Sequence, residues 1–220
     1  MIGDSSNRVS APNFNANFQS QLFQLMQWRR DVRRFRDDPV SVMDMDALIT
    51  AASLAPSVGF SQPWRFVRVG SADRRRSVLR HVEGCNTAAA SGYDEERAKA
   101  YRSLKLHGLK VAPEHLAVFC DETTHAGHGL GRQTMPEMLR YSCITAVHNL
   151  WLAARAKGIG VGWVSILEPT VIAQLLDVPD KWLLIAYLCI GYPQKAQDSG
   201  ELERAEWQAK LNRQDYYFDR

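Results

Sequence analysis

The residues best suited to chemistry form an arginine-rich run near the N-terminus. Residues 29–36 read Arg-Arg-Asp-Val-Arg-Arg-Phe-Arg, with five arginines in eight positions and one carboxylate among them. A guanidinium group stays charged and presents a planar fork of donors, so arginine suits a dianionic phosphate. Such a run can also be a solvated face, bind nucleic acid or balance acidic neighbours. Whether this run binds a phosphate must therefore be judged from the other segments of the sequence.

Three further segments are candidates for the same site. Residues 55–64 form a loop with two prolines and polar side chains, Ala-Pro-Ser-Val-Gly-Phe-Ser-Gln-Pro-Trp. Residues 158–165, Gly-Ile-Gly-Val-Gly-Trp-Val-Ser, lead into a strand. Their glycines do not form a dinucleotide fingerprint, because the spacing differs and the fingerprint joins a strand to a helix. The fourth segment is Gly191-Tyr192-Pro193, with Arg204 some way beyond it.

A His-x-x-His pair, His125 and His128, lies in the glycine-rich stretch 123–134. Two histidines can begin a metal site, but no third ligand lies nearby in the sequence. We therefore predict no metal.

The elements that must position these residues follow from apolar spacing. Helical spacing predicts helices at about 18–29, 41–54, 72–90, 94–109, 136–157 and 169–176. Short apolar runs predict strands at 65–69, 115–120, 158–165 and 182–190. The helix at 136–157 is apolar on most of its circumference, which indicates a central buried helix. Helices flanking a few strands indicate an α+β or mixed α/β fold. Residues 1–16 read as a flexible arm and 17–220 as one domain.

Composition narrows the function classes. The net charge of +3 is mild, so a dedicated nucleic-acid binder is not expected. The four cysteines are widely spaced without a Cys-x-x-Cys pair, which is typical of buried free thiols in a reducing compartment. The N-terminus lacks an apolar signal core, and the longest apolar run, 182–190, is too short to span a bilayer. We expect a soluble cytoplasmic protein with no membrane partner.

The four segments, in this order, resemble the nitroreductase flavoprotein superfamily over about residues 18–205. In that family the arginine run grips the flavin phosphate, the 55–64 loop borders the isoalloxazine ring, and a distal basic residue completes the phosphate site. The resemblance implies an α+β, nitroreductase-like FMN fold with a central mixed, mostly antiparallel sheet flanked by helices. It also implies an intertwined homodimer with each FMN between the subunits.

Two departures narrow the resemblance. Asp31 stands where the family usually has serine, and Phe60 where it usually has asparagine. Phe60 would make the pocket drier. With these residues the sequence is more similar to the BluB branch, whose members form 5,6-dimethylbenzimidazole, the lower ligand of cobalamin. The branch consumes reduced FMN with O2 and releases a tetrose phosphate, so FMN is a substrate. NAD(P)H would act only through a separate flavin reductase.

Two alternatives remain open at this point. One is an NAD(P)H-dependent nitroreductase or dehalogenase with FMN as a bound cofactor, and the other is a non-enzymatic binder of flavin or of another phosphate ligand.

The resemblance also implies a set of site residues. The implied FMN-binding residues are Arg29, Arg30, Asp31, Val32, Arg33, Ser57, Ser61, Gln62, Leu106, Ser165 and Arg204. Asp31 and Ser165 are the implied catalytic residues. Because a carboxylate repels phosphate, Asp31 should point towards the ring or ribityl chain and act as an acid-base group. Ser165 would hydrogen-bond near the ring N5.

Each of these roles has an alternative. Asp31 could simply orient the arginines, and Ser165 could be a polar residue paired within a strand. Arg204 could form an ordinary ion pair with Glu201 or Glu206. Arg34 and Arg36 are expected to be solvated.

Overall fold

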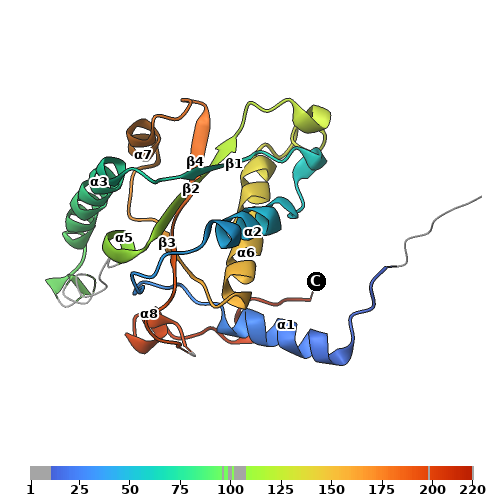
Figure 1. Ribbon diagram of the computed structural model, residues 1–220, viewed down its shortest axis with the longest axis horizontal. Helices are drawn as coiled ribbons and strands as arrows, with labels where there is room; N and C mark the ends of the chain where they lie inside the picture. Colours follow the sequence, from blue (N-terminus) through green and yellow to red (C-terminus); the bar gives the residue numbers. More distant parts are fainter. Residues whose placement is uncertain (1–10, 96, 99–100, 102–107, 198, 220) are drawn as a thin grey trace, which may run out of the picture.

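The computed structural model describes residues 11–95, 97–98, 101, 108–197 and 199–219. At its centre lies a four-stranded sheet in the order β1-β2-β4-β3 (Figure 1). The strands are β1 (Trp64–Arg68), β2 (Glu114–Asp121), β3 (Gly160–Val164) and β4 (Trp182–Gly191). All three pairs are antiparallel. The α+β fold with a mostly antiparallel sheet is therefore confirmed.

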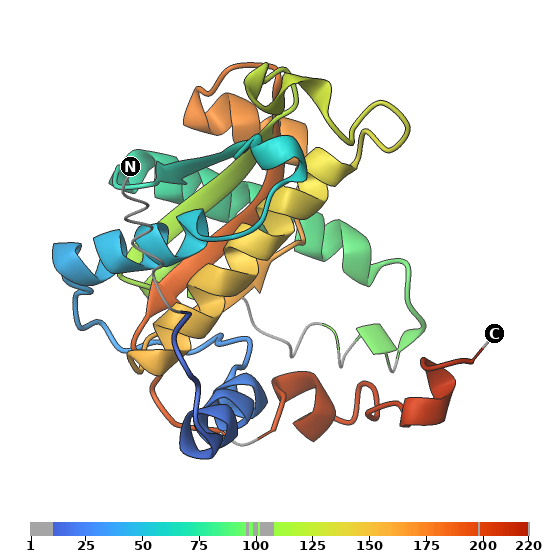
Figure 2. The same cartoon turned by 90° about the vertical axis from the view of Figure 1, so that its right-hand side faces the viewer.

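Alternate side chains of the central strands point to opposite faces of the sheet, and both sets are apolar. Helices therefore cover both faces. On β2, Leu116 and Val118 join one apolar cluster, whereas Ala117 and Phe119 join the other. One face carries α2 (Val42–Ser53) and α6 (Met138–Ala156), and the opposite face carries α3 (Ala72–Ala90) and α7 (Pro169–Leu176) (Figures 1 and 2). The expected burial of α6 is confirmed.

Local chemistry explains where these helices begin and end. The Ser41 hydroxyl accepts the Asp44 N–H at 3.0 Å at the start of α2, and Pro169 occupies the first turn of α7. Gly158, at φ +74°, follows α6 and adopts a backbone conformation that favours glycine. Helix α5 (Gly108–Val111) overlaps the end of the helix predicted at 94–109. Much of the predicted helix lies outside the described residues.

The remaining helices lie away from the sheet. Helix α1 (Ala16–Trp28) and the short α8 (Glu201–Arg204) lie at the same end of the molecule (Figure 1). The 3-10 turns are η1 (Val58–Phe60), η2 (Ala126–Gly129) and η3 (Arg213–Asp215). Residues 1–10 of the predicted arm lie outside the described residues, and residues 11–15 are exposed.

The chain that leaves α1 runs along the edge of the sheet. Val32 N–H donates to the carbonyl of Val161 at 3.0 Å, and Phe35 forms an isolated bridge with Pro193. The arginine run is thereby fixed against β3. Within the part of the chain that is described, no helix has the length and apolarity needed to cross a membrane.

Candidate active site

Asp31 lies where the arginine run meets β3. Its Oδ1 accepts the backbone N–H of Trp163 at 2.9 Å, and its Oδ2 accepts Arg33 Nε at 3.0 Å. The contact depends on Gly162, because a Cβ at that position would collide with the carbonyl oxygen of Val32. Both carboxylate oxygens are therefore held, while the side chain remains 35% exposed.

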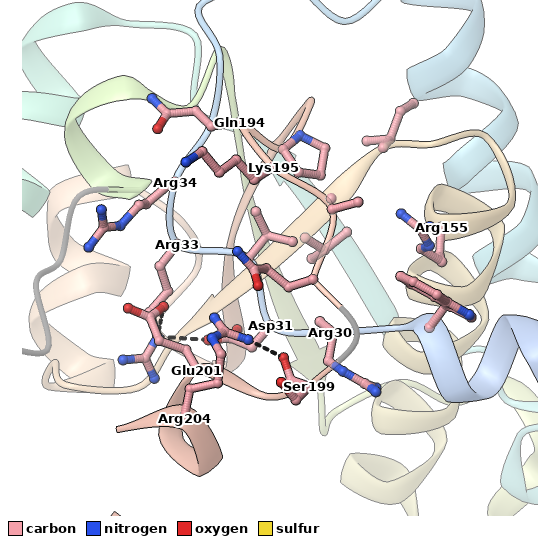
Figure 3. Close-up of a pocket in the computed structure, with 18 of the residues that line it drawn as sticks. Arg30, Asp31, Arg33, Arg34, Arg155, Gln194, Lys195, Ser199, Glu201 and Arg204 are labelled. Atoms are coloured by element: carbon pink, nitrogen blue, oxygen red, sulfur yellow. Dashed lines mark hydrogen bonds and ion pairs between the residues drawn. The ribbon is translucent and has the colours of Figure 1, made fainter. Parts of the chain in front are cut away.

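A cavity of about 550 Å³ opens beside this carboxylate. We call it the basic cavity, because six cationic side chains line it: Arg30, Arg33, Arg34, Arg155, Lys195 and Arg204. Figure 3 shows these side chains, which come from the arginine run, from α6, from the segment after β4 and from α8. Two carboxylates, Asp31 and Glu201, share the lining. This excess of positive charge suits a small dianion such as a phosphate group.

A smaller cavity of about 200 Å³ is also lined by Asp31, Val32 and Arg33. Its other lining residues include Ser165 and, from distant segments, Tyr101 and Trp207. The two predicted catalytic residues are therefore brought to one cavity. Asp31 lies at the junction between a cationic cavity and a largely apolar one, which is the arrangement that a phosphate-bearing flat ring would need.

Cys189 also lines the smaller cavity. Burial, with the charge of Asp31 acting in the same direction, raises the pKa of its thiol to about 12. The thiol therefore stays protonated near neutral pH and is a poor nucleophile.

The arginines of the run differ in their surroundings. Arg29 is not among the residues that line either cavity, and its Cζ lies 4.8 Å from the centre of the Trp151 ring. Burial, and then the charge of Arg30, lowers the pKa of Arg29. Arg36 pairs with Asp38 at 2.7 Å on the surface, as expected. Arg34 is exposed as expected, yet it also lines the basic cavity.

Arg204 comes from α8 and reaches the basic cavity. Its guanidinium donates to the carbonyl of Ser199, and Glu201 lies 3.9 Å from Arg33 Nε (Figure 3). Glu201 thus belongs to the Asp31–Arg33 group, and Arg204 is held over the cavity by the backbone.

The predicted loop residues lie elsewhere. Ser57, Ser61 and Gln62 are not among the residues lining either cavity. The loop is anchored to the start of α6, where Val58 N–H donates to the Ser142 hydroxyl at 3.0 Å. The basic cavity contacts α6 at Trp151, nine residues and so about 14 Å further along the helix. A single chain does not bring this loop to Asp31.

Two further predictions on this region differ in outcome. Phe60 is 77% exposed, so in one chain it does not make the pocket drier. Leu106 lies outside the described residues.

Several lining residues escaped the prediction from sequence. Trp151 and Arg155 belong to α6, whose apolar pattern indicates core rather than a ligand site. Arg155 is the basic residue in the last turn of that helix, and this position is the feature of the sequence that could have indicated its place in the site. Lys195 follows the Gly-Tyr-Pro motif by two residues, which places another cation in the lining of the basic cavity.

Comparisons with known proteins show the family and the fold to which the chain is similar. A 5,6-dimethylbenzimidazole synthase from Rhodospirillum rubrum is 53% identical over 201 residues, covering 91% of this chain and 95% of the relative. Another, from Rhodobacter capsulatus, is 45% identical over 90% of this chain and 96% of the relative. The crystal structure of an iodotyrosine deiodinase bound to FMN and 3-iodo-L-tyrosine has a TM-score of 0.67 at 24% identity, covering 80% of this chain and 91% of that one. The model of the nitroreductase family matches residues 26–192, and the chain belongs to that family.

Proposed function

We propose that this chain converts reduced FMN and oxygen into 5,6-dimethylbenzimidazole and a tetrose phosphate. The synthases from two bacteria, at 53% and 45% identity over nearly the whole chain, support this activity. The observation that carries the proposal is the position of Asp31, held on both oxygens at the junction of the basic cavity and the smaller cavity.

The residues present fit FMN. The phosphate would lie in the basic cavity with Arg30, Arg33 and Arg204, and the ring in the smaller cavity beside Ser165. The ribityl chain would then pass Asp31. When bound in its reduced form, the flavin supplies the electrons for oxygen and the ring carbons of the product. Arg29 lines neither cavity in one chain, so its contact with FMN stays a prediction.

Asp31 is the proposed acid-base residue. Its Oδ2 would remove a proton from the ribityl chain and later return it, and Arg33 would hold that oxygen in place. The bond from Trp163 N–H to Oδ1 fixes the carboxylate relative to β3, so its direction does not depend on the ligand. Ser165 would orient the ring edge through its hydroxyl or backbone N–H.

The complete site would need a second copy of the chain. In a homodimer, the loop of Ser57, Ser61 and Gln62 from one copy would reach the cavities of the other. The loop supports this because, in one chain, none of these three residues lines either cavity. A separate flavin reductase, present with the enzyme in the cytoplasm, would supply reduced FMN.

The test is to incubate the full-length protein with FMN, a flavin reductase, NADH and air. Dimethylbenzimidazole would be detected by chromatography and mass. The Asp31→Asn variant should still bind FMN but should form product at least about 100-fold more slowly, as expected for loss of a general acid-base group. Asp38→Asn is the matched control, because Asp38 pairs with Arg36 on the surface.

The outcomes separate the alternatives. If Asp31→Asn forms product at the parent rate, Asp31 is not the acid-base group. If the parent protein leaves FMN intact, and oxidises NADH with bound FMN when the flavin reductase is omitted, the flavin is a cofactor. The chain would then be a nitroreductase or dehalogenase, to be assayed with nitroaromatic and halogenated substrates.

A further inference from the structure

Three side chains of metal-binding type meet outside both cavities, on the face of the sheet that carries α3 and α7. His81 and Cys85 lie one turn apart on α3, and Glu168 directly precedes α7. One ligand atom from each residue can be chosen so that all three lie within 4.8 Å of one another. The reaction proposed above uses none of them.

The distances fit a zinc ion. Zinc–sulfur bonds are about 2.3 Å and zinc–nitrogen bonds about 2.0–2.1 Å, so sulfur and nitrogen on one tetrahedral zinc lie about 3.5 Å apart. Cys85 Sγ and His81 Nε2 are 3.5 Å apart in the structure. Two of the ligands therefore already have the required separation. The third, Glu168, has an exposed side chain that can reorient at little cost.

We propose that His81, Cys85 and Glu168 bind one zinc ion, with water as the fourth ligand. The mixed nitrogen, sulfur and oxygen donors favour zinc over magnesium or calcium, which prefer oxygen alone. On binding, the Cys85 thiol releases its proton to solvent. In the structure, His81 Nε2 accepts the Glu168 N–H at 2.9 Å. On zinc binding, the lone pair of Nε2 would go to the metal, so this hydrogen bond would be lost. Water can replace that acceptor, because Glu168 is exposed.

The site would have a consequence for the neighbouring cavity. Glu168 follows Ser165 by three residues, and Ser165 lines the smaller cavity. A bound ion would tie this segment to α3. The proposal stands on the α3–α7 contact and is independent of the flavin reaction.

The test uses the full-length protein without a histidine tag. Calorimetric titration with Zn²⁺ should give one ion per chain, and Co²⁺ should give the intense visible bands of a tetrahedral site with a thiolate-to-cobalt charge-transfer band. Cys85→Ser, His81→Gln and Glu168→Gln should each weaken binding at least about 100-fold, because even outer-shell changes cost about 10–100-fold. His125→Gln/His128→Asn is the control and should bind as the parent does. Millimolar Mg²⁺ should not compete.

Several results would overturn the proposal. These are no zinc binding by the parent, a cobalt spectrum without the thiolate band, or unchanged affinity in Cys85→Ser. Loss of binding in the His125/His128 control would place the ion in that loop instead. If Cys85→Ser does not fold, as judged by circular dichroism, Glu168→Gln and the cobalt spectrum of the parent decide.

Discussion

His115 on β2 is a buried titratable residue that the proposed reaction does not use. Its side chain is 1% exposed, and its Nδ1 lies 2.9 Å from the hydroxyl of Tyr187. Burial, and then the charge of Arg75, lowers the pKa of the imidazole from 6.5 to about 3. Burial also raises the pKa of Tyr187. The pair is therefore neutral in the folded protein across the physiological range.

This neutral histidine should make the protein less stable in acid. Between pH 6.5 and about 3 the unfolded chain binds a proton at His115 that the folded chain does not, so the free energy of unfolding falls as the pH falls. From about pH 7 to about pH 5 the expected loss is about 2 kcal/mol. Urea unfolding at several pH values should show this loss of stability in the parent, and His115→Gln should lack it.

His148→Gln is the control, because His148 is an exposed residue of α6. It measures how much the exchange of a histidine for glutamine changes the stability by itself. Equal pH dependences in the parent and in His115→Gln would show that folding does not lower the pKa of His115.

At the scale of elements, the site depends on how closely the arginine run approaches β3. Val32 N–H bonds to the carbonyl of Val161, and the bare backbone of Gly162 allows Val32 to lie against the strand. Any side chain at Gly162 would push residues 31–32 off the sheet edge. The bond from Trp163 N–H to Asp31 would then be lost.

Gly162→Ala should therefore lower the free energy of unfolding by about 2–3 kcal/mol, as overpacking does, and should weaken FMN binding. Gly84→Ala is the matched control. It lies in α3 with nothing within 4 Å of an added Cβ, so it should stabilise the protein by about 0.5–1 kcal/mol. Urea unfolding and flavin titration measure both effects. A Gly162→Ala variant as stable as the parent would mean that the run does not rest on β3.

The elements themselves could be predicted from sequence because their signals are local. The Ser41 cap, the Pro169 start and the apolar spacing of α6 all act within a few residues of the boundary they set. The site could be predicted only in part. Asp31 and Trp163 are 132 positions apart, and no local pattern reports that bond. Arg155 looks like the polar end of a core helix until the fold brings it to the basic cavity.

At the scale of the whole molecule, large apolar side chains remain on the surface. Helix α1 has no buried residue, and Phe23 is 73% exposed. Elsewhere on the chain, Met43 is 83% and Leu130 73% exposed. On α1, Phe18, Met26 and Trp28 are exposed as well, and several exposed apolar side chains on one element are typical of a protein–protein interface. Because residues 57–62 line neither cavity in one chain, we expect this surface to contact a second copy of the chain whose loop completes the site.

Mixing two variants tests whether two chains share each site, provided that each variant alone is inactive, as we expect for Asp31→Asn and, if Gln62 contacts FMN, for Gln62→Ala. In a shared site, a heterodimer of an Asp31→Asn chain and a Gln62→Ala chain has one site with both defects and one with neither. Random pairing makes about half of the dimers mixed, so about a quarter of the parent activity should return. If each site lies within one chain, mixing restores nothing, because every site keeps one defect. Product formation after co-refolding separates the two results, and Asp31→Asn mixed with Arg33→Ala, both on the same cavity, is the control that should stay inactive.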